Sequence, residues 1–315
     1  MKSTLKQLEY VQAAGKFLSI AVAAKQLNIS QSSVGTAINL VEHEFEVTIF
    51  IRQRSRGLAV TSEGKRFLVR LEHMLAEVGR FSAEAKGQAE DLQGELKVGC
   101  FAALAPHVLP VILTELSSQH PNLTLHIYEG HLRRVQEQLL NGSTDFALTY
   151  DLGLSDQIEI ETLGEAPPHV VMAEDDPLVK KPTVSLTDLA GRRMILLDIP
   201  ESRDYFERLL LGLENPPRVI HRTETYEMVR ASVAAGLGIS VLNLKPLIDE
   251  TYIGARTVCR PFDTPLAAPK FVLAQRRDSY SSRAVQAFSE CCRRFFATPR
   301  AMQHVIRNDT GVLSD

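Results

Sequence analysis

The sequence predicts an α/β protein built from an N-terminal winged helix-turn-helix, a long linker helix and a C-terminal region of two subdomains. Three observations lead to this prediction. Residues 18–61 contain two short helical patterns joined by a polar turn and followed by an arginine-rich ribbon. Residues 62–92 carry an apolar stripe that recurs every three and four positions. Beyond Gly94 the pattern alternates between strands and helices, which is typical of sheets covered by helices.

The charge of the chain is unevenly divided. Residues 1–70 contain ten Lys/Arg and five Asp/Glu, a balance of +5, so the remaining residues sum to −8 in a chain whose net charge is −3. A basic segment on an acidic body favours a sequence-directed reader of nucleic acid and opposes an architectural nucleoid protein. Hydrophobic residues make up 44% of the 315 residues, which is ample for the cores of two or three compact units.

The turn of the helix-turn-helix is predicted from the chemistry of its residues. Ala21, Ala24 and Leu27 are spaced three apart, so we expect them to share a buried face of the first helix. Asn28 should end that helix, because Asn tolerates the left-handed conformation of a helix C-cap. Ser30 should cap the next helix by accepting a backbone N–H bond.

The second helix is expected to bury Val34, Ile38 and Val41 and to leave a polar face at its N-terminal end. This is the layout of a recognition helix that enters the major groove of double-stranded DNA. A solvated helix face is the alternative interpretation. The candidate DNA-binding residues on this helix are Ser30, Gln31, Ser32, Ser33 and Thr36.

The ribbon that follows Phe50 carries Arg52, Arg54 and Arg56 at alternate positions. Alternate residues of a strand face one way, so the three guanidinium groups should point to one side. Three cations on one side repel each other unless an anion lies opposite, and DNA phosphates are suitable anions. Scattered surface charge is the alternative.

Residues 62–92 predict a helix of about 30 residues, roughly 45 Å long. Such an apolar stripe favours a linker that pairs with a second helix in a dimer, although packing on the core of its own chain is the alternative. The stripe consists of Phe67, Leu68, Leu71, Leu75, Val78 and Phe81.

The C-terminal region should contain parallel sheets with helices on their faces. Two βα units fit its length better than one large sheet, and we expect the last strand and helix to return to the first unit. Strands are predicted at 95–100, 123–129, 145–150, 169–173, 193–197, 218–222, 238–243 and 270–275. Helices are predicted at about 105–118, 132–141, 203–211, 226–235 and 282–296.

Several kinds of site are not indicated. The four cysteines lack zinc-site spacing and should be reduced, partly buried thiols, although Cys100 is a candidate redox sensor if a helix N-terminus lowers its pKa. The histidines lack the spacing of a metal site, and no GxSxG, GxxxxGK[ST], CxxC or HExxH motif occurs, so we predict no cofactor and no enzyme activity. The lack of an apolar run of eighteen residues predicts no membrane association and a cytoplasmic location.

The chain resembles the LysR-type transcriptional regulators of bacteria (LTTR) over nearly its whole length. The N-terminal signature comprises Leu5, Leu8, residues 21–31, Val34, Ile38, Glu42, residues 50–52 and residues 56–64. The C-terminal half is similar to the effector domain of that family, itself similar to periplasmic binding proteins, at residues 96–99, 104–106, 109–110, 142–148 and 233–240. The resemblance implies a ligand-responsive regulator that binds promoter DNA and a small-molecule effector as a homodimer or homotetramer, with RNA polymerase as a further candidate partner.

The composition and pattern of the chain predict its domain boundaries, and the resemblance implies that the first domain is winged. The predicted domains are a winged helix-turn-helix at 1–61, a linker helix at 62–92, an effector-binding domain at 93–300 and a tail at 301–315. Within the effector-binding domain, subdomain I should comprise about 93–165 and 266–300, and subdomain II about 166–265.

The recognition helix departs from the family pattern. Family members usually carry a Ser and then a basic residue where this chain has Gly35 and Thr36, so residues 31–42 contain no Lys or Arg. Gly35 costs the helix roughly 1 kcal/mol relative to Ala. A Gln can still bond adenine in a bidentate way, and phosphate binding should depend more on the wing.

Candidate effector contacts lie where strands end and helices begin, because ligands of open α/β sheets bind there. The backbone N–H groups at 100–103 could hold a carboxylate. Each residue is alternatively an ordinary cap or turn residue, and Ser202 is expected to cap the helix after it. The candidates are Cys100, Phe101, Ala102, Ala103, Thr149, Tyr150, Pro200, Ser202, Thr223 and Thr225. A cytosolic small-molecule-binding protein or enzyme with an appended helical domain is the alternative function.

Overall fold

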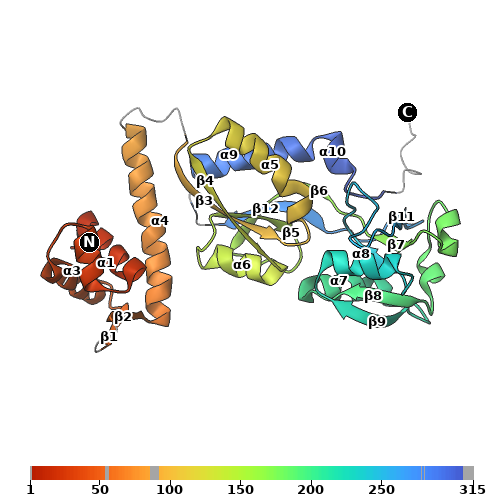
Figure 1. Cartoon of the computed structure of the whole chain (residues 1–315), viewed down its shortest axis with the longest axis horizontal. Coiled ribbons are helices and arrows are strands. Elements are labelled where there is room, and N and C mark those ends of the chain that lie inside the picture. Colours follow the sequence, from red (N-terminus) through yellow and green to blue (C-terminus); the bar gives the residue numbers. More distant parts are fainter. Residues whose placement is uncertain (1, 54–56, 86–91, 278, 280, 308–315) are drawn as a thin grey trace. The chain divides into compact units, whose positions relative to one another are not determined.

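The computed structural model describes residues 2–53, 57–85, 92–277, 279 and 281–307 (Figure 1). The chain forms two compact units, of which the first spans residues 1–91 and the second contains almost all of the remainder. In the part of the chain that the structure describes, no helix has both the length and the apolar composition needed to cross a membrane.

The first unit is a winged helix-turn-helix followed by a long helix, as predicted. Its elements are α1 (Leu5–Phe17), α2 (Ile20–Gln26), α3 (Gln31–Glu44), β1 (Phe50–Gln53), β2 (Gly57–Val60) and α4 (Ser62–Ala85). Strands β1 and β2 pair as an antiparallel hairpin, the wing.

The core of this unit confirms part of the predicted stripe pattern and corrects another part. Val34, Ile38 and Val41 of α3 are buried as expected. The expected shared face of α2 is wrong, because Ala21 is exposed and Ala23 is buried beside Ala24. Helix α2 packs against both α1 and α3, so its buried face is set by two neighbours rather than by one stripe. Helix α1 was not predicted.

Helix α4 shows which part of the linker stripe has a partner within its own unit. Leu71 is buried, and Phe67, Leu68 and Leu75 pack half-buried against the helix-turn-helix core. A Cβ at Gly15 of α1 would lie 2.7 Å from a methyl carbon of Leu68, so α1 and α4 approach closely there. Farther along α4, Phe81 is 72% exposed. The alternative interpretation, packing on the chain's own core, therefore holds for the first half of the stripe.

The second unit alternates strands and helices, as predicted. Its first half contains β3 (Gly94–Phe101), α5 (Ala105–Gln119), β4 (Leu123–Gly130), α6 (Leu132–Leu140), β5 (Phe146–Tyr150), β6 (Ile158–Glu165) and β7 (His169–Ala173). Two 3₁₀ turns follow, at Pro177–Lys180 and Leu186–Leu189. Its second half contains β8 (Arg193–Leu197), α7 (Pro200–Leu210), β9 (Arg218–Thr223), α8 (Tyr226–Ala234), β10 (Ser240–Leu242), β11 (Thr257–Pro261), β12 (Lys270–Arg276), α9 (Arg283–Phe296) and α10 (Pro299–Met302).

A five-stranded sheet of order β4-β3-β5-β12-β6 organises one part of this unit. Helices α5 and α9 cover one face and α6 covers the other (Figure 1). The prediction of parallel sheets is wrong in part, because β12 runs antiparallel to both β5 and β6. Strand β12 enters the sheet about 120 residues after β5, from the other part of the unit, and this return reverses its direction.

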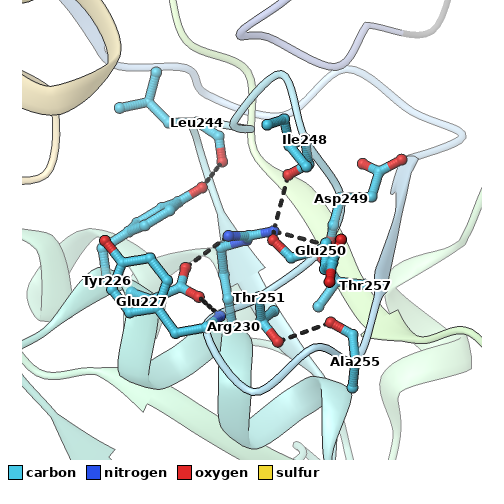
Figure 2. Close-up of polar contacts among 11 residues, drawn as sticks. Tyr226, Glu227, Arg230, Leu244, Ile248, Asp249, Glu250, Thr251, Ala255 and Thr257 are labelled. Atoms are coloured by element: carbon cyan, nitrogen blue, oxygen red, sulfur yellow. Dashed lines mark hydrogen bonds and ion pairs between the residues drawn. The ribbon is translucent and has the colours of Figure 1, made fainter.

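The other part of the unit contains a parallel pair, β8-β9, and an antiparallel sheet of order β10-β7-β11. Strands β6 and β11 were not predicted. Four consecutive exposed residues follow the first residue of β6, an edge strand, and β11 ends in Pro261, so neither shows a buried strand pattern. The loop from β10 to β11 wraps around the side chain of Arg230, which lies on α8 (Figure 2).

Candidate functional site

The turn between α2 and α3 has the predicted local structure. Asn28 has a φ of 54°, and the backbone N–H of Ser33 donates to the Ser30 side chain at 3.1 Å. The Ser30 hydroxyl also lies 2.8 Å from the hydroxyls of Ser32 and of Ser33. Local hydrogen bonds therefore set the N-terminal end of α3 and orient its serine side chains.

The polar face of α3 is exposed. Gln31, Ser32, Ser33 and Thr36 all lie on it, as does Asn39, which the sequence analysis did not select. Asn39 follows from the same helical spacing, since residues four apart share a face. This face offers amides and hydroxyls but no cation, which suits contacts with base edges rather than with phosphates.

Glu42 connects α3 to the wing. One of its carboxylate oxygens accepts hydrogen bonds from the backbone N–H groups of Ile49, at 2.7 Å, and Phe50, at 2.9 Å. The Thr61 hydroxyl donates to the Thr48 carbonyl oxygen at 2.6 Å on the other side of the ribbon. The base of the wing is thus held between α3 and the start of α4. Glu42 belongs to the N-terminal signature. Its contact with Ile49 and Phe50 depends on the turn after α3, which the spacing of apolar residues does not reveal.

The wing presents one described arginine. Arg52 is exposed on β1, and its Nη2 lies 3.5 Å from the Asn39 amide oxygen, beside the polar face of α3. Arg54 and Arg56 lie outside the described residues.

The candidate effector residues of the first half of the unit meet at one edge of the five-stranded sheet. Strands β3 and β5 are parallel neighbours, with Cys100 opposite Leu148, so their carboxyl ends lie together. The rings of Phe101 and Tyr150 are 5.5 Å apart, and the Ala102 N–H donates to the Gly130 carbonyl oxygen. The residues brought together here are Cys100, Phe101, Ala102, Ala103, Thr149 and Tyr150.

Two buried hydroxyls at this edge lack partners. Thr149 and Tyr150 are 1% and 4% exposed, and their hydroxyl oxygens have no hydrogen-bond partner among the described residues. Burial raises the pKa of Tyr150 well above its usual value, and the hydroxyls of Tyr226 and Tyr205 raise it further. Tyr150 therefore stays a neutral hydrogen-bond donor.

Three helices near the strand ends begin without a side-chain cap. For α5, α7 and α8, no side chain of the described residues accepts a hydrogen bond from the first turn, whereas Ser282 and Thr298 cap α9 and α10. Ala103 and Ala105 are buried residues, and within the described ranges their backbone N–H groups have no acceptor. Such N–H groups can bind an anion.

The remaining effector candidates are placed around α7 and α8. Helix α7 begins at Pro200, so Ser202 is its third residue and is buried, and the expected cap role of Ser202 is wrong. Proline sets the first position of a helix and moves its start three residues earlier than predicted. The Asp198 N–H donates to the carbonyl oxygen of Thr223, which ends β9. Thr225 precedes α8 and is exposed.

Cys100 does not have the environment of a reactive thiol. It is fully buried, and burial raises the pKa of its thiol, an effect to which Glu129 adds. A redox sensor needs an accessible thiol of lowered pKa. The redox-sensor interpretation is therefore wrong in its premise, because the thiol is buried in the core that the sheet forms with α5 and α9, and burial raises its pKa instead of lowering it.

Side-chain bonds join the two halves of the unit. The Tyr205 hydroxyl donates to the Ala267 carbonyl oxygen at 2.7 Å, and the Asn243 amide donates to the Ala166 carbonyl oxygen at 2.7 Å. Ala166 lies between β6 and β7 and Ala267 between β11 and β12, so both acceptors lie where the chain passes between the five-stranded sheet and the sheet of β10, β7 and β11. An ion pair of 3.1 Å also connects Arg133 of α6 with Glu201 of α7.

We expect the protein to lose stability as the pH falls below about 6.5. Burial lowers the pKa of His107 from 6.5 to about 4, with help from His304 and Arg230, and burial lowers that of His169 to about 3. In the unfolded chain, histidines take up protons near pH 6.5. In the folded protein, His107 and His169 take them up only near pH 4 and pH 3. Their stabilising contribution is therefore complete above pH 6.5 and is lost towards pH 4 and pH 3, by about 1–2 kcal/mol each at pH 5.

Urea denaturation at pH 7 and pH 5 measures this loss. Between pH 7 and pH 5, the free energy of unfolding should fall less in the variant His107→Gln than in the wild type. An equal fall in both proteins would contradict the assignment of the pH dependence to His107.

The chain is similar to known bacterial regulators over most of its length. A family model described as the bacterial regulatory helix-turn-helix protein of the lysR family matches residues 5–65, and one described as the LysR substrate binding domain matches residues 89–297. The chain is 25% identical to the HTH-type transcriptional regulator AlsR of Bacillus subtilis, over 88% of this chain and 91% of that protein. It is 29% identical to the regulator YwqM of the same organism, over 93% and 99%. The crystal structure of HinK, a LysR family transcriptional regulator from Pseudomonas aeruginosa, shares 29% identity, with a TM-score of 0.62 and coverage of 94% and 99%.

Proposed function

Since the chain belongs to the LysR family of bacterial transcriptional regulators, with a helix-turn-helix DNA-binding domain and an effector-binding domain, we propose that it reads promoter DNA through α3 and the wing and senses a carboxylate-bearing metabolite. The observation that carries the DNA-binding part is the exposed polar face of α3, held beside the wing by Glu42. The family regulates transcription and does not catalyse reactions.

The proposed DNA contacts divide into two kinds. Base edges in the major groove are read by the polar residues at the start of α3, and phosphates are bound by the wing. The exposure of Arg52 next to Asn39 supports this division, since it places a cation beside the uncharged face. The proposed contacts are Ser30, Gln31, Ser32, Ser33, Thr36, Arg52, Arg54 and Arg56.

Binding to duplex DNA should weaken steeply with salt, and Arg52→Ala should make this dependence less steep by about one unit of slope. The reason is that one fewer phosphate is neutralised and fewer counterions are released. Fluorescence anisotropy over a salt series measures the slope. The matched control is Lys180→Ala, which removes an exposed cation from the second unit and should leave the slope unchanged. No binding to any duplex at low salt would favour the alternative of a small-molecule-binding protein.

The proposed effector site lies between subdomain I, at about 93–165 and 266–300, and subdomain II, at about 166–265. The N–H groups of Ala103 and Ala105 support a carboxylate there, because they are donors at a helix start that have no acceptor among the described residues. The Tyr150 hydroxyl, a neutral donor, supplies a second contact. The proposed contacts from subdomain II are Pro200, Ser202, Thr223 and Thr225.

Tyr150→Phe should leave the ligand-free protein as stable as the wild type or slightly more stable, while weakening effector binding. Removing a buried hydroxyl without a partner removes a desolvation cost, whereas a ligand loses one hydrogen bond, worth about 0.5–1.5 kcal/mol. Thermal shift with a panel of small carboxylates and their amides measures both effects. A wild type stabilised by amides as much as by carboxylates would contradict the ligand class.

Binding of the effector is proposed to bring the subdomains together about the connections at Ala166 and Ala267. The effector shifts the equilibrium between the open and the closed arrangement of the subdomains only if its affinities for the two arrangements differ. We propose that the protein acts in the cytoplasm as a homodimer or homotetramer paired through α4, where Phe81 is exposed, and that it contacts RNA polymerase at the promoter. The LysR regulators as a class bind DNA and small effectors and oligomerise.

A further inference from the structure

Gly35 has no structural cause within its own unit. It lies inside α3 without a positive φ, and a Cβ at this position would have no described atom within 4 Å outside the adjoining helix backbone and its chain neighbours. Neither the backbone nor the packing excludes a side chain there. Because glycine lowers helix stability relative to alanine, its presence needs another explanation.

The other three glycines among the first 65 residues each have a cause. A Cβ at Gly15 would lie 2.7 Å from Leu68, and one at Gly64 would lie 2.3 Å from the Ile49 carbonyl oxygen. Gly57 has a φ of +81°, and a Cβ there would lie 2.5 Å from the Leu18 carbonyl oxygen. Gly35 is therefore the exception among the glycines of residues 1–65, and the space where its Cβ would lie is open among the described residues.

The neighbours of Gly35 on the helix surface are polar. Gln31 lies one turn before it and Asn39 one turn after it, and both are exposed. Gln and Asn amides pair with the major-groove edge of adenine, whereas guanine is usually bound by Arg or Lys, which α3 does not carry on this face. An adenine bonded in this way is paired with a thymine, whose 5-methyl group projects into the same groove.

We propose that Gly35 is a specificity-determining residue of this regulator, and that the 5-methyl group of a thymine packs against its Cα between Gln31 and Asn39. This inference rests on the proposed DNA-reading function of α3. The missing side chain provides the room for the methyl group, so a methyl on the protein and a methyl on the base compete for one space. The operator then contains an A·T pair opposite Gly35.

A swap of methyl groups between protein and DNA tests this inference. The full-length protein first enriches its preferred sequence from a random duplex pool, and each thymine is then replaced by uracil, which lacks only the methyl group. Replacement of one of these thymines by uracil should weaken binding of the wild type about fourfold, which corresponds to the free energy of burying one methyl group. Gly35→Ala should bind the thymine duplex at least about fivefold more weakly, as for one mismatched pair, and should recover affinity with uracil at that same position.

Two controls separate this effect from changes in folding or assembly. Gly79→Ala makes the same substitution in α4, where a Cβ also meets nothing within 4 Å among the described atoms, and should keep the wild-type preference for thymine over uracil. Hydrogen exchange of α3 should be as slow in Gly35→Ala as in the wild type or slower, because alanine favours the helix.

The outcomes distinguish the inference from the proposed function. A thymine preference that reverses in Gly35→Ala supports the inference. Suppose that the wild type enriches a sequence, but that the ratio of affinities for the thymine and uracil duplexes is the same in both proteins at every position. That result overturns the inference and leaves the proposed function standing. If the wild type enriches no sequence and binds no duplex, the proposed DNA-reading function fails and the inference fails with it.

Discussion

Replacing Arg230 with alanine should lower the free energy of unfolding of the second unit by about 3–5 kcal/mol. The Arg230 side chain is 6% exposed and pairs with Glu227 at 2.6 Å. Its Nη2 also donates to the carbonyl oxygens of Ile248, Asp249 and Glu250 at 3.0–3.3 Å (Figure 2). Truncation leaves the largely buried Glu227 carboxylate without its cation and removes the donor that three carbonyl oxygens of the loop share.

The effect should be concentrated in the loop from β10 to β11. The other carboxylate oxygen of Glu227 accepts from the Tyr252 N–H at 2.8 Å, so the ion pair holds the loop at two places. Urea denaturation measures the loss of stability, and hydrogen exchange should become faster at the Thr251 and Tyr252 amides before it does so in β7.

Arg222→Ala is the matched control for the loss of an arginine. The Arg222 side chain is 47% exposed, and its ion pairs with Asp198 and Glu207 are 3.7 and 3.6 Å long. Exposed pairs contribute little, so this variant should lose less than about 1 kcal/mol. Equal losses in the two variants would show that the acceptors of Arg230 do not stabilise the loop.

Glu42→Ala should destabilise the first unit and weaken its binding to DNA. Ile49 is fully buried and Phe50 is 7% exposed, and their N–H groups would lose the carboxylate oxygen that accepts from both. A buried donor left without an acceptor costs about 1–3 kcal/mol. The wing would then be less firmly held beside α3, so Arg52 would be less well positioned for a phosphate.

Glu42→Gln separates the hydrogen bonds from the charge. Its amide oxygen can accept from the same two N–H groups, so stability and DNA affinity should stay close to those of the wild type. Chemical denaturation and anisotropy with one duplex measure the two quantities for both variants. A glutamine variant as weak as the alanine variant would contradict the role of Glu42 as a hydrogen-bond acceptor for the wing.

The helix-turn-helix turn was predictable residue by residue because its causes are local. The left-handed Asn28 and the Ser30 cap depend on hydrogen bonds within a few residues. The buried stripe of Val34, Ile38 and Val41 follows from helical spacing alone. In α2 the three-residue spacing alone misplaced Ala21, because this short helix packs against both α1 and α3 and buries Ala23 beside Ala24.

The site in the second unit was predictable only in part. Strand ends indicated Tyr150 and Ala103, but not that the hydroxyl of one and the N–H of the other would lack partners in the described chain. Those facts depend on which groups burial brings together, as does the raised pKa of the Cys100 thiol. The contact of Glu42 with the wing and that of Arg230 with residues 248–250 likewise join segments that sequence patterns treat separately.

The sequence by itself determined the class of most elements, the turn that orients α3 and the family, because these follow from side-chain spacing and local hydrogen bonds. Only the tertiary structure decided the reversed direction of β12, the half of α4 that packs on its own unit, and the anchoring of the wing and of the loop around Arg230. The physical reason is that these contacts join segments that are far apart in the sequence. They form only when the chain folds back on itself, and side-chain spacing does not reveal where it does so. A glycine with nothing beside it, such as Gly35, has meaning only once its surroundings in space are known.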